Sequence, residues 1–74
     1  MTDRDYYAEI MNLRSELIKQ GGTPEIIMVS PDVYIEMIKQ LRSYITKNMT
    51  LFGCELVMVE TLPEGTMLVQ QVVW

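Results

Sequence analysis

Two short apolar runs, separated by a helix-length segment, constrain the fold of this chain more than any other feature. The first run is residues 26–29 and the second is residues 54–59. Ser30 and Pro31 follow the first run and signal a helix start. A serine oxygen can cap a helix, and at the first helical position the missing N–H of proline costs no hydrogen bond. A helix over 31–45 is therefore predicted. Since polar and apolar residues do not alternate in the first run, we expect its strand to be covered on both faces.

A further helix is predicted before the first run, over residues 3–20. Its apolar residues recur at the spacing of one helix face; they are Tyr6, Ile10, Leu13 and Leu17. Thr2 or Asp3 can cap the start of this helix with a side-chain oxygen. Gly21 and Gly22 are expected to end it, because glycine adopts the left-handed conformation of a helix stop.

The C-terminal half of the chain predicts two further strands, over 54–60 and 66–73. Pro63 and Gly65 favour a type I turn between them. Because only this short turn joins the two strands, we expect them to form an antiparallel hairpin. The predicted helix between 26–29 and 54–60 would also permit a parallel pairing of these two strands through a right-handed crossover.

The predicted fold is a small α/β (α+β) domain spanning residues 1–74 in the order α-β-α-β-β, with two helices packed on a three-stranded sheet. Hydrophobic residues make up 49% of the chain. A chain of this size buries only about 60% of its unfolded surface. The hydrophobic content is generous for that size and therefore indicates a real core. A flexible linker is expected at 46–50. The expected core residues are Tyr6, Ile10, Leu13, Leu17, Ile27, Val29, Tyr34, Met37, Ile38, Leu41, Leu56 and Met58.

The charge balance argues against nucleic acid and membranes as partners. Ten acidic and six basic residues give a formal net charge of -4, and the basic residues form no run. Binding to phosphate or to an anionic membrane requires clustered lysine and arginine. No apolar run approaches the ~20 residues of a membrane span, and the N-terminus does not look like a signal peptide. We therefore expect a soluble, cytoplasmic protein.

Side chains suited to catalysis are scarce. The chain contains no histidine, which removes the usual general base near neutral pH and the commonest metal ligand. Cys54 lies in an apolar run without a second cysteine, so we expect a buried structural thiol in a reducing, intracellular setting. Glu55 with Glu60 or Glu64 is the one local carboxylate cluster. We expect no catalytic residue, no metal site and no cofactor, and hence a protein that is not an enzyme.

Three segments of the chain carry a family resemblance. Residues 23–31 lead into a helix with Tyr34, residues 51–57 combine Leu-Phe-Gly with an apolar strand, and residues 62–66 form a Leu-Pro-Glu-Gly turn before another apolar strand. In this order they resemble the later part, the axial or peripheral domain, of tailed-bacteriophage major capsid proteins, over about residues 9–73. The resemblance implies protein–protein assembly without cofactor or catalysis. Those subunits are several times longer, and this chain has no room for their spine helix, extended loop or N-terminal arm.

The end of the chain is the predicted partner-binding site. It consists of Val72, Val73 and Trp74, an apolar finish on a strand expected at a sheet edge. Tryptophan is favoured at interface centres and exposed edges pair with other chains, although a Trp74 that covers its own core would explain the same residues. The predicted function is a non-enzymatic protein–protein interaction module in phage or prophage structure or assembly, binding its own copies or a capsid subunit in the host cytoplasm or virion. The alternative is a small acidic phage or bacterial protein that binds and inhibits a host protein.

Overall fold

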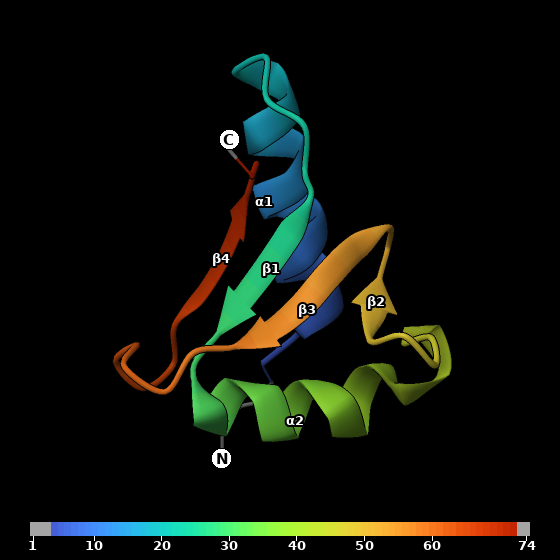
Figure 1. Cartoon of the computed structure of the whole chain (residues 1–74), viewed down its shortest axis with the longest axis vertical. Coiled ribbons are helices and arrows are strands. Elements are labelled where there is room, and N and C mark those ends of the chain that lie inside the picture. Colours follow the sequence, from blue (N-terminus) through green and yellow to red (C-terminus); the bar gives the residue numbers. More distant parts are fainter. Residues whose placement is uncertain (1–3, 73–74) are drawn as a thin grey trace.

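The computed structural model describes residues 4–72 of the chain. These residues form a small α+β domain, as the sequence predicted, with a mixed sheet in the strand order β2-β3-β1-β4 (Figure 1). The strand β2 is an addition to the expected three. In chain order the elements are α1 (Tyr6–Lys19), β1 (Ile26–Val29), α2 (Pro31–Leu41), the 3-10 helix η1 (Arg42–Tyr44), β2 (Thr50–Leu51), β3 (Cys54–Met58) and β4 (Met67–Gln70).

The first strand, β1, lies in the middle of the sheet. It pairs in parallel with β3, with Ile27 opposite Leu56, which is the pairing that the intervening helix was expected to permit. On its other side it pairs antiparallel with β4, with Ile27 opposite Val69. The expected hairpin between 54–60 and 66–73 is therefore wrong. The connection between β3 and β4 is long enough to cross the ~10 Å occupied by one intervening strand, and β1 thereby gains hydrogen-bond partners on both sides.

Both helices begin at side chains that suit a helix start. Asp5 caps α1, since its Oδ1 accepts a hydrogen bond from the Ala8 N–H at 3.1 Å, so the expected cap by Thr2 or Asp3 is wrong. The helix ends before the glycine pair, as predicted. Ser30 is the N-cap position of α2 and Pro31 its first residue, also as predicted.

The second helix is shorter than expected and stops at Leu41 instead of reaching residue 45. The chain tightens there into η1, where the Ile45 N–H is shared between the carbonyl oxygens of Leu41 and Arg42. A tightened last turn is a common way to satisfy the carbonyl groups at a helix end.

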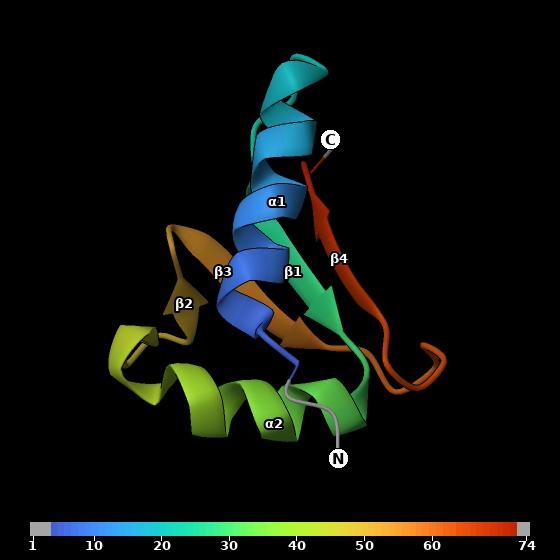
Figure 2. The same cartoon turned by 180° about the vertical axis from the view of Figure 1, so that it is seen from behind.

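The core lies between the sheet and the two helices. Figure 2 shows α1 in front of β1, on the face of the sheet opposite to the view of Figure 1. Ile27 and Val29 of β1 are fully buried on the helix side, whereas Ile26 and Met28 are only half-buried. The expectation that this strand is covered on both faces is therefore wrong, because both helices pack into one core on a single face of the sheet.

The buried apolar residues confirm most of the expected core. They are Tyr6, Ile10, Ile27, Val29, Val33, Met37, Leu41, Leu51, Cys54, Leu56 and Met67. Leu13 and Tyr34 pack against this cluster. Met58 was expected in the core but is 41% exposed at the end of β3. Leu51 was not expected there, because β2 was not foreseen. Cys54 is a buried free thiol, as predicted.

Candidate protein-binding surfaces

The sheet face that carries no helix is apolar along its middle. Met28 lies opposite Val57 of β3 and opposite Leu68 of β4, so these three side chains form one row across the sheet. All three are half-buried, as is the neighbouring Ile26. In Figure 1 neither helix crosses this face of the sheet. We call Ile26, Met28, Val57 and Leu68 the open face.

One edge of the sheet, formed by β4, lacks the features that usually protect an edge strand. Within residues 4–72, β4 pairs with β1 alone. Thr66 and Gln70 accept hydrogen bonds from the β1 side, so the backbone groups of Met67 and Val69 point away from the sheet. Residues 67–71 include neither a charge nor a proline. Charges and prolines are what normally keep such edges from pairing with other chains.

The predicted partner-binding residues follow this edge directly. Val72 is half-buried just beyond β4. Val73 and Trp74 lie outside the described residues. The structure therefore places the predicted site beside the β4 edge through Val72 alone, and it adds the open face, which the sequence analysis did not anticipate.

The opposite edge of the sheet is closed. Its strand, β2, has only two residues, and Ile45 forms a bridge to Leu51 on the outer side. The Thr46 N–H donates to the Thr50 carbonyl at 3.0 Å, and the hydroxyl groups of these two threonines lie 2.7 Å apart. The expected flexible linker at 46–50 is therefore wrong, because its polar groups are tied to each other.

A partly exposed cluster of three aromatic rings lies beside this closed edge. Tyr7 of α1, Tyr44 of η1 and Phe52 of the β2–β3 turn have ring centroids 5.2 to 5.6 Å apart. Phe52 and Gly53 have φ values of 52° and 80°, as both central residues of a tight primed hairpin turn require. Such a φ is strained for phenylalanine. This cluster was not predicted from the sequence, because its residues come from three separate segments.

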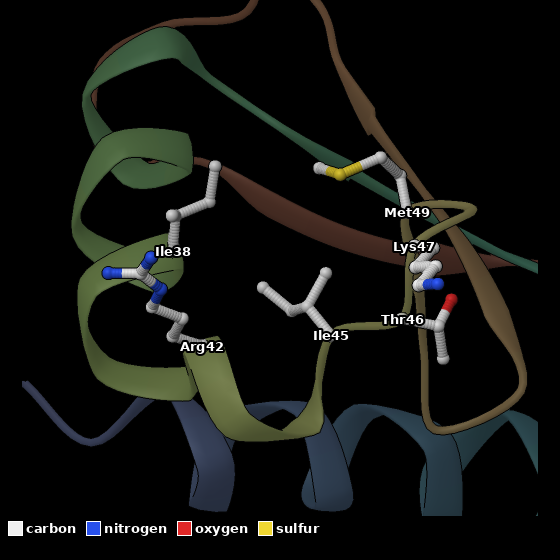
Figure 3. Close-up of a pocket in the computed structure, with 6 residues that line it drawn as sticks. All are labelled: Ile38, Arg42, Ile45, Thr46, Lys47 and Met49. Carbon is white, nitrogen blue, oxygen red and sulfur yellow. The ribbon is translucent and has the colours of Figure 1, made fainter.

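A groove of about 450 Å³ lies between the end of α2 and the segment that follows it (Figure 3). Ile38, Ile45 and Met49 supply its apolar lining, and Arg42 and Lys47 bring positive charge to it. Ile38 was expected in the core but is half-buried here. This groove was not predicted from the sequence, since it depends on the closing of the loop between η1 and β2.

The two cations of the groove differ from most other basic residues of the chain. Ion pairs join Arg4 to Glu9, Lys19 to Glu16 and Lys39 to Glu36. Within the part of the chain that the structure describes, Arg42 and Lys47 take part in no ion pair, and both side chains are exposed. The groove therefore gathers unpaired positive charge in a chain whose net charge is -4.

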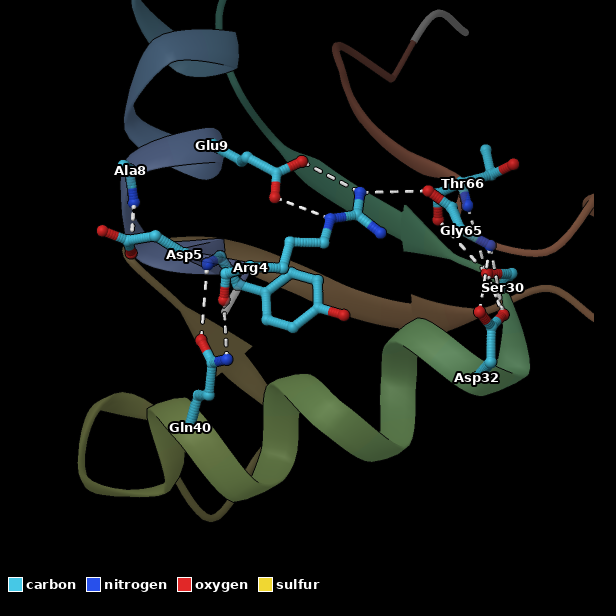
Figure 4. Close-up of polar contacts among 10 residues, drawn as sticks. Arg4, Asp5, Ala8, Glu9, Ser30, Asp32, Gln40, Gly65 and Thr66 are labelled. Carbon is cyan, nitrogen blue, oxygen red and sulfur yellow. Dashed lines mark hydrogen bonds and ion pairs between the residues drawn. The ribbon is translucent and has the colours of Figure 1, made fainter. Parts of the chain in front are cut away.

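The connection between β3 and β4, residues 59–66, is held against the start of α2 (Figure 4). We call it the crossing loop. The Asp32 carboxylate accepts a hydrogen bond from the Gly65 N–H at 3.0 Å, and the Ser30 N–H donates to the Thr66 carbonyl at 3.1 Å. Arg4, which is paired with Glu9, donates to the Gly65 carbonyl at 3.0 Å. These contacts fix the end of the loop.

The turn inside the crossing loop differs by one residue from the predicted type I turn. The Thr66 N–H donates to the Pro63 carbonyl at 3.3 Å, so Pro63 is the first turn residue and Gly65 the third. Gly65 has a φ of 78°, which the third position of a type II turn requires and which glycine adopts without strain.

Hydrogen bonding at the base of the crossing loop shifts the titration of Asp32. The hydroxyl of Ser30 donates to the Asp32 carboxylate at 2.6 Å. This bond, together with the one from the Gly65 N–H, lowers the pKa of Asp32, because both donors favour the charged carboxylate. Nearby, the hydrogen bond to Glu9 raises the pKa of Arg4.

The residues considered for chemistry do not form a buried site. Glu55 lies on β3, and Glu60 and Glu64 lie on the crossing loop; all three are exposed. Within residues 4–72 no cluster of histidine, cysteine, aspartate or glutamate has an arrangement that would hold a metal ion. Over the same residues, neither helix has the length and apolar character needed to cross a membrane.

Comparison of the chain with family models, with curated proteins and with solved structures found no match. The surfaces described above are therefore the observations on which a function can be proposed.

Proposed function

We propose that this chain is a non-enzymatic protein-binding module that pairs with its partner through the β4 edge and the adjoining open face. The observation that carries the proposal is the uncharged, unprotected strand β4 beside a row of half-buried apolar side chains. In line with the capsid resemblance, the role is structural or in assembly, in a phage or prophage, and the partner is a copy of the chain or a capsid subunit.

The physical basis of this binding is strand addition. A partner strand alongside β4 would hydrogen-bond to the outward backbone groups of Met67 and Val69 and extend the sheet. The row formed by Leu68, Met28 and Val57 would then continue onto the partner and bury more apolar area. Val72 follows β4 and would contribute to the same surface, with Val73 and Trp74 following in sequence.

The proposal is tested by placing a charge on the surface. Leu68→Lys puts an ammonium group on the edge and on the open face, and a charge there opposes pairing. Asn12→Lys on the exposed side of α1 is the matched control with the same charge change. Because residue 68 is only half-buried, we expect both variants to fold, which circular dichroism and thermal unfolding will verify.

Binding is measured by photocrosslinking in cells that produce the chain naturally, with a photoreactive residue at position 70 or, as control, at position 12. We expect adducts from position 70 to the chain itself or to a capsid subunit, and their loss in the Leu68→Lys background. Adducts to a single host protein would instead support the inhibitor alternative. Equal adducts from both positions, or none, would refute binding through the β4 edge.

A further inference from the structure

The groove at the end of α2 combines an apolar lining with unpaired positive charge. Ile38, Ile45 and Met49 offer apolar contact, and Arg42 and Lys47 are exposed beside them (Figure 3). A complementary occupant needs an apolar side chain between two negative charges. An acidic segment also suits the groove because exposed cations without partners gain more from a new carboxylate than cations already paired.

The crossing loop has this complementary pattern. Leu62 is half-buried on it, and the exposed residues Glu60 and Glu64 flank Leu62 at equal distances in sequence. The loop is preorganised, since the Leu62 N–H donates to the Val59 carbonyl at 3.2 Å and Asp32 holds the Gly65 N–H. A preorganised segment loses little conformational entropy when it binds.

The loop and the groove lie at opposite ends of α2 and therefore cannot meet within one molecule. The loop is tied to Asp32 in the first turn of the helix, whereas the groove is lined by Ile38 and Arg42 at its end. The helix has 11 residues, which corresponds to a length of about 16 Å. Figures 1 and 2 both show the loop and the segment after η1 on opposite sides of the molecule.

From this arrangement we propose that copies of the chain associate head to tail, with Glu60, Leu62 and Glu64 of one copy seated in the groove of the next. The contact joins two different surfaces, so it is heterologous and generates a ring if the rotation between copies closes, or a filament if it does not. This inference adds a self-contact to the protein-binding role proposed above, and it uses neither the β4 edge nor the open face.

The association is weak and sensitive to salt. Exposed ion pairs each contribute little to binding, and salt screens them. Leu62 against the apolar lining supplies the rest of the binding. Sedimentation velocity at low salt should therefore show an average mass that rises with protein concentration, and added salt should reduce this rise.

Charge reversal at each end provides the decisive test. The variant Arg42→Glu/Lys47→Glu has an acidic groove and an acidic loop, and Glu60→Lys/Glu64→Lys has a basic groove and a basic loop. We expect each variant alone to lose the concentration dependence. An equimolar mixture should regain it, because each loop then faces an oppositely charged groove. The control Asn12→Glu/Ser15→Glu/Lys19→Glu makes the same change in net charge at exposed positions of α1 and should associate like the unaltered chain.

Several outcomes would overturn the head-to-tail contact. They are an unaltered chain that stays monomeric at all concentrations, a reversed variant that associates normally, or a mixture that does not recover. All four reversed side chains are exposed, and circular dichroism will verify folding. If a reversed variant does not fold, Leu62→Asp on the unaltered chain provides the test, since it should abolish association. Leu68→Lys should leave the groove-dependent association unchanged, so a loss of association in that variant, with none in the charge-reversed variants, would place the self-contact at the β4 edge.

Discussion

The strands β4 and β2 lie at opposite edges of the same sheet, yet only β2 is closed. At the β2 edge, an isolated backbone bridge joins Ile45 to Leu51, and in the neighbouring loop the Thr46 N–H donates a hydrogen bond to the Thr50 carbonyl. At the β4 edge, the four residues of the strand are all uncharged, and among residues 4–72 no other strand lies beside its outer side. The difference indicates that edge protection in this chain is selective, and that the unprotected edge is the better candidate for a partner strand.

Backbone strain is distributed in the same unequal way. The non-glycine residues with positive φ among those described are Met49 and Phe52, and both lie next to β2. Such conformations persist only where the surrounding structure over-determines them. For Phe52, contact with the rings of Tyr7 and Tyr44 opposes the strain, since aromatic pairs contribute about 0.5–1.5 kcal/mol beyond their buried area. For Met49 the carbonyl group accepts from the Leu56 N–H at 2.9 Å.

The largest difference between the closed edge and the open face should appear in the free energy of unfolding when apolar side chains are truncated. Leu51→Ala at the closed edge removes a fully buried side chain and should cost about 2–5 kcal/mol of unfolding free energy. Val57→Ala on the open face removes a half-buried side chain and should cost about 1 kcal/mol or less. Urea unfolding measures both. Equal losses would show that the open face is as well packed as the core.

A smaller effect is expected in the turn at the closed edge. Gly53 has a φ of 80°, and no atom lies within 4 Å of the position that a Cβ would occupy there. Gly53→Ala should therefore destabilise the fold only through backbone conformation, by about 1 kcal/mol. Asn48→Ala in the preceding turn is the control and should stay within about 0.5 kcal/mol. If Gly53→Ala has no effect on thermal unfolding, the turn is not held in the left-handed conformation.

The smallest effect concerns the anchor of the crossing loop and depends on pH. Hydrogen bonds from Ser30 and Gly65 lower the pKa of Asp32 below its ordinary value of 3.8. A lowered pKa in the folded state stabilises the fold above the unfolded pKa, and this stability is lost as the pH falls through the folded pKa. Asp32→Asn should therefore melt below the unaltered chain at neutral pH, with the difference vanishing in acid. A constant difference at all pH values would exclude this linkage.

The positions of helix starts, helix ends and strands could be predicted from the sequence, because they depend on residues that are close together in the chain. Ser30 and Pro31 start α2, although the Ser30 hydroxyl bonds the Asp32 carboxylate and makes no side-chain cap bond, and the glycine pair follows the end of α1. Alternating burial in β1 was the exception: four apolar residues in a row indicate a strand but not which of its faces a helix will cover. The burial of Cys54 followed from its apolar run.

The candidate surfaces could not be predicted, because each depends on how separate segments pack against one another in the fold. Strand order decided that β1 separates β3 from β4 and leaves β4 at an edge, a choice that the turn at Pro63 and Gly65 does not encode. The aromatic cluster arises where α1, η1 and the β2–β3 turn converge, and the groove arises where the loop between η1 and β2 folds back beside the end of α2. Sequence by itself determined the class of fold, the helix starts and much of the core, since periodicity and capping are local. Tertiary structure alone decided which apolar face stays open and which strand lies at the unprotected edge, since both depend on packing between segments far apart in the chain.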